Sequence, residues 1–355
     1  MDSVTQLAFG GVVAAAGFRR LLGRRAALVG GLLGVLPDLD TVASWMIGAD
    51  VTDAWAHHRG VTHSIPVTLV YGAALGWAVW RIERLRREPM DVREDNARRS
   101  AWMWLGSLAC VTHPVIDLFT SYGTQLLAPF SDVRFAIDAM PIIDPLYSLP
   151  LLLAFLFALF TRSKAQLAQR LARFSLIYVL LYTLMAWGVG QSLEARIREQ
   201  LRLELGGAAH GAEVTAYPIL LQPFWRRIVV DLPDHILIGF LSPFDDRPVP
   251  WQQYSRLDEH RAVQAALETR SGTVFRWFAM GKLHWSLQAS QDGGYVVEAR
   301  DYRYGLPNGS ELGFWGLRFR LDAQLKPTAK AELLSERPAA NGGSFRDLWD
   351  GLLGR

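Results

Sequence analysis

The chain has 355 residues, of which half are apolar and only 20% are charged, fewer than the roughly 25% typical of a soluble domain. Its length favours two domains over one. The net charge of +3 gives no indication of a nucleic-acid partner, and the single cysteine, Cys110, excludes a disulfide framework within one chain. The sequence opens with Met1-Asp2-Ser3 and lacks a basic n-region, so we expect no cleavable signal peptide.

Two short apolar runs come first, Val4–Phe18 and Ala26–Leu36. Each is short for a membrane crossing, which takes about 20 residues. Both carry glycines, and small residues let helices approach closely in lipid. We therefore expect a closely packed helical pair, with two buried helices of a soluble protein as the alternative. The glycines expected at the contact are Gly10, Gly11, Gly30, Gly31 and Gly34.

Longer apolar runs follow, and each has about the length that crosses a hydrocarbon core of roughly 30 Å. They are Ser64–Trp80, Ala101–Phe119, Pro141–Phe160 and Arg173–Gly190. With the short pair, they predict a multi-pass α-helical membrane domain over residues 1–190.

The pattern changes after Gly190. Ser192–Leu205 predicts an amphipathic helix, and short runs separated by turn signals such as Asp292-Gly293-Gly294 then predict strands. The predicted strands are Pro218–Gln222, Arg227–Leu232, Ile236–Leu241, Thr273–Phe278, Trp285–Ala289, Tyr295–Ala299 and Leu312–Leu321. We expect a smaller, mainly-β (α+β) soluble domain over residues 191–330, followed by a loose C-terminal tail over residues 331–355.

Basic residues are concentrated in three connectors between the apolar runs, and such connectors are typically cytoplasmic. Six segments place all three on one side, so the C-terminal domain falls on the other side, which is the periplasm in a bacterium. The first cluster is Arg19, Arg20, Arg24 and Arg25; the second is Arg81, Arg84, Arg86, Arg87, Arg93, Arg98 and Arg99; the third is Arg162, Lys164, Arg170 and Arg173.

Acidic and imidazole groups gather at the opposite, non-basic ends of the apolar runs. His113 and Asp117 are four residues apart and therefore share one helix face, although Pro114 lies between them. Ionisable groups in a membrane segment are costly and are candidates for function. Histidine and carboxylate ligands suit zinc and related divalent metals. The candidate metal ligands are Asp38, Asp40, His58, His63, His113 and Asp117.

Each of these groups also has a simpler interpretation. Asp38 and Asp40 can end a helix in water, and His58 can lie in a solvated loop. His63 can belong to a helix N-terminus, and a lone His113 can be a hydrogen-bonded core residue. Their joint occurrence on one predicted side of the membrane favours a metal site.

At these residues the sequence resembles the YdjM-like family of bacterial inner-membrane metal-dependent hydrolases, over about residues 1–190. Where Gln6 stands the family often carries a histidine, although glutamine also occurs there, and many members carry a glutamate where this chain has Ala14-Ala15-Ala16. The matching stretches are Met1–Gln6, Gly34–Asp40, His58–Ser64, Thr112–Asp117, Thr120–Leu126, Pro129–Asp132 and Ile143–Tyr147, with weaker matches at Pro223–Arg226 and Asp301–Gly305.

The resemblance implies a metal-binding protein of the bacterial inner membrane that hydrolyses an ester. We expect one or two divalent ions, with zinc favoured, and a bound water that attacks the ester. Asp138 or Asp144 is a candidate general base or partner of a ligand histidine. Arg59 and Arg134 are candidates to neutralise a phosphate.

The expected substrate is a phosphate or carboxylic ester of a lipid or another amphiphile, because the site lies at the membrane surface. The expected partners are membrane lipid and such a substrate, with no nucleic acid. The alternative is a non-enzymatic membrane protein with a structural metal site and a C-terminal domain that binds a partner. Five tryptophans of that domain fit either ordinary core packing or a partner surface: Trp225, Trp251, Trp277, Trp285 and Trp315.

Overall fold

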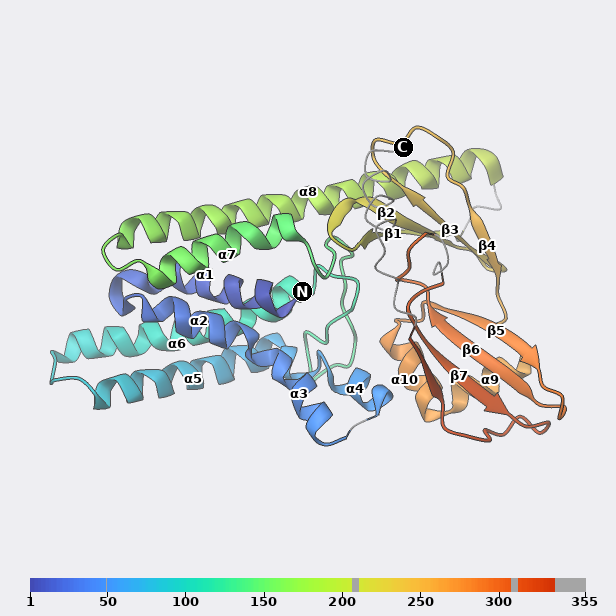
Figure 1. Ribbon diagram of the computed structural model, residues 1–355, viewed down its shortest axis with the longest axis horizontal. Helices are drawn as coiled ribbons and strands as arrows, with labels where there is room; N and C mark the ends of the chain where they lie inside the picture. Colours follow the sequence, from blue (N-terminus) through green and yellow to red (C-terminus); the bar gives the residue numbers. More distant parts are fainter. Residues whose placement is uncertain (49, 206–210, 308–311, 336–355) are drawn as a thin grey trace. The chain divides into compact units, whose positions relative to one another are not determined.

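The computed structural model describes residues 1–48, 50–205, 211–307 and 312–335, which divide into two units. The first unit contains Met1–Ile137 and Ile142–Met185, and the second contains Asp138–Pro141 and Ala186–Arg355. The first is helical, whereas the second is built around two small antiparallel sheets (Figure 1). The predicted class, a helical domain followed by a mainly-β domain, is confirmed.

The first two helices, α1 (Ser3–Leu22) and α2 (Arg25–Val35), pack against one another along their glycines. A Cβ atom at Gly34 would lie 2.7 Å from the Gln6 carbonyl oxygen, which is too close for any other side chain. The predicted helical pair is therefore confirmed.

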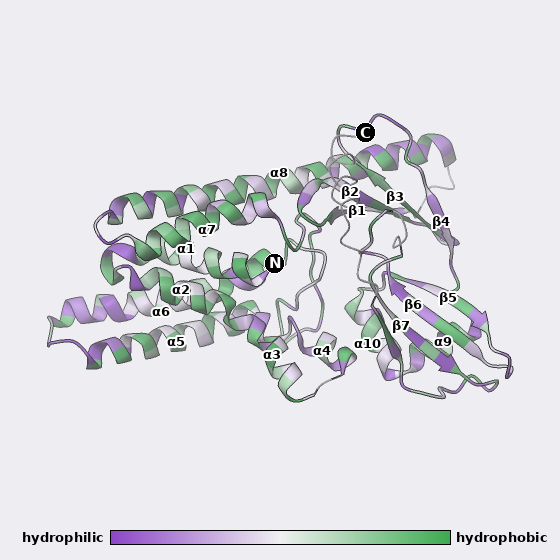
Figure 2. Cartoon of the chain, in the orientation of Figure 1, coloured by the Kyte–Doolittle hydropathy of each residue, from purple (hydrophilic) through white to green (hydrophobic). Residues whose placement is uncertain are grey.

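Two short 3₁₀ turns and five further helices follow in this unit before its last long helix. A 3₁₀ turn (Leu36–Asp38) leads from α2 into α3 (Leu39–Met46), and α4 (Val51–His57) follows. A second 3₁₀ turn (Val61–His63) precedes α5 (Ile65–Leu85), which packs against α6 (Val92–Asp117). Then comes α7 (Pro145–Phe160). Figure 2 shows hydrophilic residues gathered at the α5–α6 connection.

Three helical stretches of the described chain are long and apolar enough to cross a membrane: Arg25–Met46, Ile65–Leu85 and Ala165–Glu204. The shorter α7 is also apolar. The stretches do not include α6, whose first turns are strongly charged, so the expectation that Ala101–Phe119 crosses the membrane stays a prediction.

The last long helix, α8 (Ala165–Leu205), is continuous, whereas we predicted a span ending at Gly190 and a separate amphipathic helix. That prediction was wrong. A glycine in a helix interior costs only about 1 kcal/mol, and strong helix formers stand within about two turns of Gly190 on both sides, at 184–186 and 193–196. In the second unit, Leu193, Ile197 and Leu201 of α8 pack against the first sheet.

Each sheet has four antiparallel strands in sequence order. The first contains β1 (Glu213–Ile219), β2 (Gln222–Asp231), β3 (His235–Leu241) and β4 (Gln252–Ser255). The second contains β5 (Leu283–Ala289), β6 (Tyr295–Asp301), β7 (Trp315–Leu321) and β8 (Glu332–Ser335). Strand β8 falls in the expected tail, and residues 336–355 lie outside the described residues.

Two helices, α9 (Arg261–Glu268) and α10 (Arg270–Phe278), separate the sheets in sequence. The predicted strand Thr273–Phe278 was wrong, because it lies in α10. The Thr269 side chain accepts a hydrogen bond from the Gly272 N–H and caps the helix. Phe275 and Phe278 are both buried at helical spacing, so tertiary packing outweighs the β-propensity of this run.

Candidate metal centre

The six predicted ligands all lie at the ends of elements in the helical unit. Asp38 ends the first 3₁₀ turn and Asp40 begins α3, because Pro37 and the turn redirect the chain after α2. His58 follows α4, and His63 ends the second 3₁₀ turn. His113 and Asp117 occupy the last turns of α6, one helical turn apart, and both are buried.

One group of candidate ligands consists of Asp38, His63 and His113. Asp38 Oδ1 lies 3.2 Å from His113 Nε2 and 3.4 Å from His63 Nε2. Both imidazole rings are fully buried, and neither Nε2 atom has a hydrogen-bond partner among the described residues. Two imidazole nitrogens and one carboxylate oxygen therefore face the same point.

The protonation of His113 follows from its other nitrogen. Nδ1 lies 2.7 Å from the Gly34 carbonyl oxygen, which can only accept a hydrogen bond. In a neutral ring, Nδ1 therefore carries the proton and Nε2 presents its lone pair to the group. A backbone carbonyl in this position orients a metal-ligating histidine.

His63 is held in the same way by Asp40 and Thr62. The His63 Nδ1 atom lies 3.0 Å from the Thr62 hydroxyl and 3.4 Å from Asp40 Oδ2. The Thr62 hydroxyl donates to Asp40 Oδ2 over 2.8 Å. Burial acts to lower the pKa of His63, but the nearby carboxylates of Asp38 and Asp40 outweigh it and the pKa is raised.

A second group contains Asp40, His58 and the same His63. His58 Nδ1 lies 2.9 Å from Asp40 Oδ1. Burial lowers the pKa of His58, which Asp40 only partly opposes. The Asp38 and His58 side chains are each 19% exposed, so the centre opens on their side.

Asp117 borders the first group from α6. Its Oδ2 atom lies 3.7 Å from His63 Nε2 and 3.6 Å from His113 Nε2. The same oxygen lies 3.0 Å from Arg59 Nε, and Oδ1 accepts a hydrogen bond from Gln6 over 3.0 Å and contacts the Met1 nitrogen. Asp117 is thus a neutralised carboxylate with a fixed orientation.

The donor set fits a divalent metal. Four ligands at about 2.0–2.1 Å from one ion stand about 3.3–3.4 Å apart in a tetrahedron. The separations from Asp38 Oδ1 to His113 and His63, 3.2 and 3.4 Å, match this spacing, and those from Asp117 are slightly longer. Buried imidazole nitrogens without partners are expected where an ion is the partner.

The other predicted site residues are placed differently. The Arg59 guanidinium also donates to the Thr120 hydroxyl, and Arg134 donates to the Tyr122 and Gly123 carbonyls, so both stabilise the loops beside the centre. Asp144 caps α7 by accepting from the Leu146 and Tyr147 N–H groups, and it accepts from the Tyr182 hydroxyl. Asp138 belongs to the second unit and has φ +55°.

Sequence reasoning missed three contributors to the centre: the Gly34 carbonyl, the Thr62 hydroxyl and the Gln6 amide. Thr62 could have been identified because it stands next to His63, and Gln6 because it occupies a position where the family often carries a histidine. The role of the Gly34 carbonyl had no signal in the sequence, because a backbone acceptor for His113 can be identified only from the helix packing.

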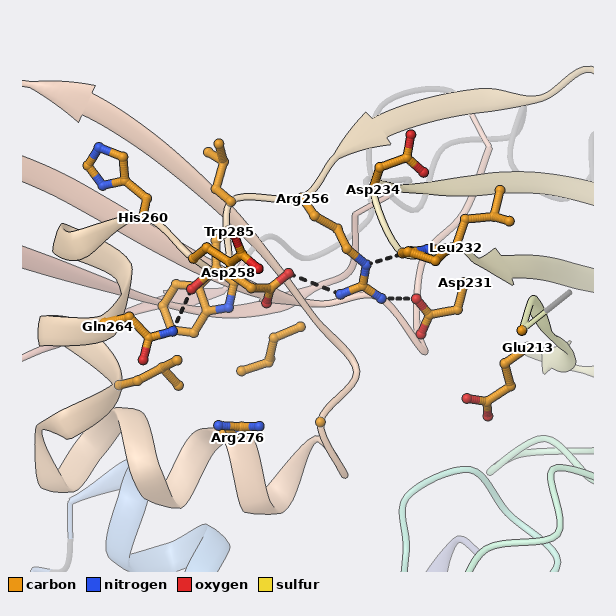
Figure 3. A pocket seen from close by; sticks show the side chains of 17 residues that line it. Glu213, Asp231, Leu232, Asp234, Arg256, Asp258, His260, Gln264, Arg276 and Trp285 are labelled. Atoms are coloured by element: carbon orange, nitrogen blue, oxygen red, sulfur yellow. Dashed lines mark hydrogen bonds and ion pairs between the residues drawn. The ribbon is translucent and has the colours of Figure 1, made fainter. Parts of the chain in front are cut away.

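The second unit contains a cavity of about 940 Å³ between the β2–β3 turn, the loop after β4 and helices α9 and α10 (Figure 3). Its charges largely pair with one another. Arg256 contacts Asp231 and lies 3.0 Å from Asp258, and Lys282 lies 2.6 Å from Glu213. The chemically distinctive cluster is therefore that of the helical unit.

Comparison with known protein families matches the part of the chain that contains this cluster. The chain is similar to the uncharacterized protein YfhP of Bacillus subtilis (strain 168), 31% identical over 109 residues, which cover 31% of this chain and 29% of that protein. The matched region is thus less than a third of that relative. No solved structure matches the chain. The model of the YdjM inner membrane protein family matches residues 1–192, which include all six candidate ligands and more than half of the sequence, and the chain therefore belongs to this family.

Proposed function

We propose that this protein is a metal-dependent hydrolase of the bacterial inner membrane that cleaves a phosphate or carboxylic ester of a lipid or another amphiphile. One observation carries the proposal: the buried Nε2 atoms of His63 and His113 have no hydrogen-bond partner among the described residues and converge on Asp38 Oδ1. A buried polar atom without a partner costs about 1–3 kcal/mol, and a bound cation removes that penalty at both rings.

Asp38, His63 and His113 would hold the ion, and Asp117 offers the nearest further donor. Three protein ligands with a remaining position are typical of catalytic zinc sites, and two histidines with a carboxylate favour zinc. A metal bound there would supply Lewis-acid activation of water and of the ester oxygen.

The protein's own groups prepare the site. The Gly34 carbonyl and the Asp40–Thr62 pair fix the two imidazole rings with their Nε2 lone pairs inward. Arg59 pairs with the buried carboxylate of Asp117 and neutralises its charge, so that Asp117 repels the nearby carboxylate of Asp38 less strongly. His58 and Asp38 border the open side, where a substrate would enter.

Membrane location supports the proposal that the substrate is amphiphilic. The family is one of inner membrane proteins, and the unit that holds the centre has long apolar helices. On the positive-inside rule, we expect the arginine-rich connectors in the cytoplasm, and therefore the centre at the outer surface and the C-terminal domain in the periplasm.

Elemental analysis of the purified protein, combined with a screen of phosphate and carboxylic esters that includes phospholipids, tests this function. We expect about one or two zinc ions per chain and turnover of at least one amphiphilic ester. A His113→Ala variant is expected to lose both, whereas His57→Ala is the matched control, because the exposed His57 lies outside both ligand groups. Absence of metal in the unmodified protein would contradict the proposal.

A second candidate function has support of its own. The His63 and His113 rings are fully buried and Asp117 is neutralised, as in closed structural sites. In that case the metal would stabilise the helical unit, and the C-terminal unit would bind a partner. Stoichiometric metal without turnover of any ester would favour this candidate.

A further inference from the structure

The segment that carries Asp38 and Asp40 has buried or partly buried polar side chains on one side and exposed apolar side chains on the other. Asp40 and Ser44 face the protein: Asp40 is bonded to His58 and Thr62, and Ser44 is buried. Its large apolar side chains face outward, with exposed fractions of 51% for Leu39, 46% for Val42, 80% for Trp45, 73% for Met46 and 79% for Ile47. These five residues are called the apolar ledge below.

This arrangement is the reverse of a helix on the surface of a soluble protein, which turns its apolar face inward. A contiguous exposed apolar surface indicates contact with a membrane or a partner. The ledge lies directly beside the open side of the metal centre, because Asp38 and Asp40 alternate with Leu39 in the chain.

Three features indicate that lipid covers the ledge. The ledge continues the apolar stretch Arg25–Met46, which is long enough to cross a membrane. Helix α2 has 11 residues and spans only about 16 Å, so a crossing that begins at Arg25 reaches the membrane surface near α3. A tryptophan at the end of such a stretch is typical of the interface between hydrocarbon and headgroups.

Charge excludes a role for acidic lipid headgroups. The range 37–57 contains four carboxylates, Asp38, Asp40, Asp50 and Asp53, and no lysine or arginine. Contact with a bilayer must therefore depend on the apolar side chains and not on attraction to anionic lipid.

We propose that the apolar ledge lies in the interfacial layer of the bilayer and holds the open side of the metal centre at the depth of lipid ester linkages. The ledge and the ligands Asp38 and Asp40 belong to one short segment, the 3₁₀ turn and α3, so the depth of the ledge sets the depth of the centre. The depth itself does not require the proposed hydrolase function. A failure of turnover and a failure of this inference are therefore distinguishable.

Site-directed spin labelling of the full chain tests the proposal. Cys110 is buried and is the single cysteine, so Cys110→Ala gives a background for one introduced label. The label at Met46→Cys is compared with Leu180→Cys, an exposed position in the stretch Ala165–Glu204, and with Gln324→Cys, an exposed position of the C-terminal unit. Accessibility to oxygen and to a water-soluble nickel chelate is measured after reconstitution into phosphatidylcholine vesicles, with and without phosphatidylglycerol.

We expect the Met46 label to be protected from the nickel chelate and accessible to oxygen, at a depth between the Leu180 and Gln324 labels. The same depth is expected with and without phosphatidylglycerol. A Met46 label that behaves like the Gln324 label would overturn the proposal. Strong dipolar broadening at Met46 that disappears on dilution with unlabelled protein would also overturn it, because a second copy of the chain would then cover the ledge.

Discussion

The imidazole rings of His63 and His113 meet edge to face with their centroids 4.7 Å apart, and each directs an unpartnered Nε2 atom at Asp38. Both rings are fully buried, so water cannot satisfy these nitrogens from bulk solvent. Two lone pairs held side by side in this way are unfavourable without a cation between them. The relationship between these residues is the main structural reason to expect a metal.

His63→Ala and His113→Ala are each expected to abolish metal binding. Each removes one of the three donors of the group Asp38, His63 and His113, and even the loss of a group that only orients a ligand typically reduces metal affinity about 10–100-fold. Metal content per chain, measured by inductively coupled plasma mass spectrometry, checks this. His57→Ala should retain the metal, and retention of full metal content by both site variants would contradict the assignment.

Asp117→Asn is expected to destabilise the helical unit by roughly 3 kcal/mol, because it removes the carboxylate that neutralises the buried Arg59. It should also weaken metal binding. Thermal unfolding in detergent with a chelator measures the first effect, and metal content measures the second. The control Glu94→Gln changes an exposed carboxylate on the same helix and should cost no more than about 0.5 kcal/mol. If the Asp117→Asn protein has the stability and metal content of the parent, Asp117 neither stabilises the helical unit through Arg59 nor contributes to metal binding.

The sequence predicted the candidate centre well because its members follow a simple rule. Asp38, His63, His113 and Asp117 all stand at the non-basic ends of apolar runs, and the ends of antiparallel helices meet in one layer. The glycine pattern of the first two helices predicted their close packing for a similarly local reason. Asp144 followed by Pro145 is a helix N-cap pattern, so its capping role could also have been recognised.

Other features depend on packing that no local pattern encodes. The pairing of Arg59 with Asp117 requires the path of the loop between α4 and α5, and Arg134 reaches carbonyls that only the folded loop presents. The run Thr273–Phe278 has strong β-propensity, yet burial of Phe275 and Phe278 on one helical face decides its conformation. In α8, the helix continues beyond Gly190, where Leu193 and Ile197 pack against the first sheet.

His284 is expected to make the C-terminal unit sensitive to acid. Burial lowers its pKa below the ordinary value of 6.5, so the folded state prefers the neutral ring. When the pH falls below 6.5, the unfolded chain takes up a proton that the folded unit resists, and the free energy of unfolding decreases. Above that pH, His284 makes no pH-dependent contribution.

Thermal unfolding of the full chain between about pH 7.5 and 5.5 checks this prediction in the parent and in His284→Gln. The variant should lose part of the acid sensitivity. The matched control is His260→Gln, which changes a histidine of the same unit that caps α9. An unchanged pH profile in His284→Gln would show that another group is responsible.

Arg303→Met is expected to destabilise the C-terminal unit by about 3–5 kcal/mol, because it leaves Asp301 buried without its cation. The Arg303–Asp301 pair is fully buried, with 2.6 Å between Nη2 of Arg303 and Oδ2 of Asp301. The control Arg318→Met removes an equally close partner of Glu298 that is partly exposed, and should cost about 0–1 kcal/mol. Chemical unfolding measures the free energy of unfolding of both variants. Equal destabilisation by Arg303→Met and Arg318→Met would contradict the prediction.

The C-terminal unit is expected to face the periplasm, and the argument depends on the distribution of charge along the chain. The connectors over residues 81–99 and 162–173 are both rich in arginine and are therefore expected in the cytoplasm. Helix α8 begins at the second of these connectors and contains an apolar stretch long enough to cross the membrane, so its far end should emerge on the opposite side. Within the described residues beyond α8, no helix is long and apolar enough to return. Alkaline phosphatase fused after Arg355 should be active, because it folds only after export. An inactive phosphatase fusion, together with a bright fusion of a fluorescent protein that folds only in the cytoplasm, would place the unit in the cytoplasm and reverse the proposed topology.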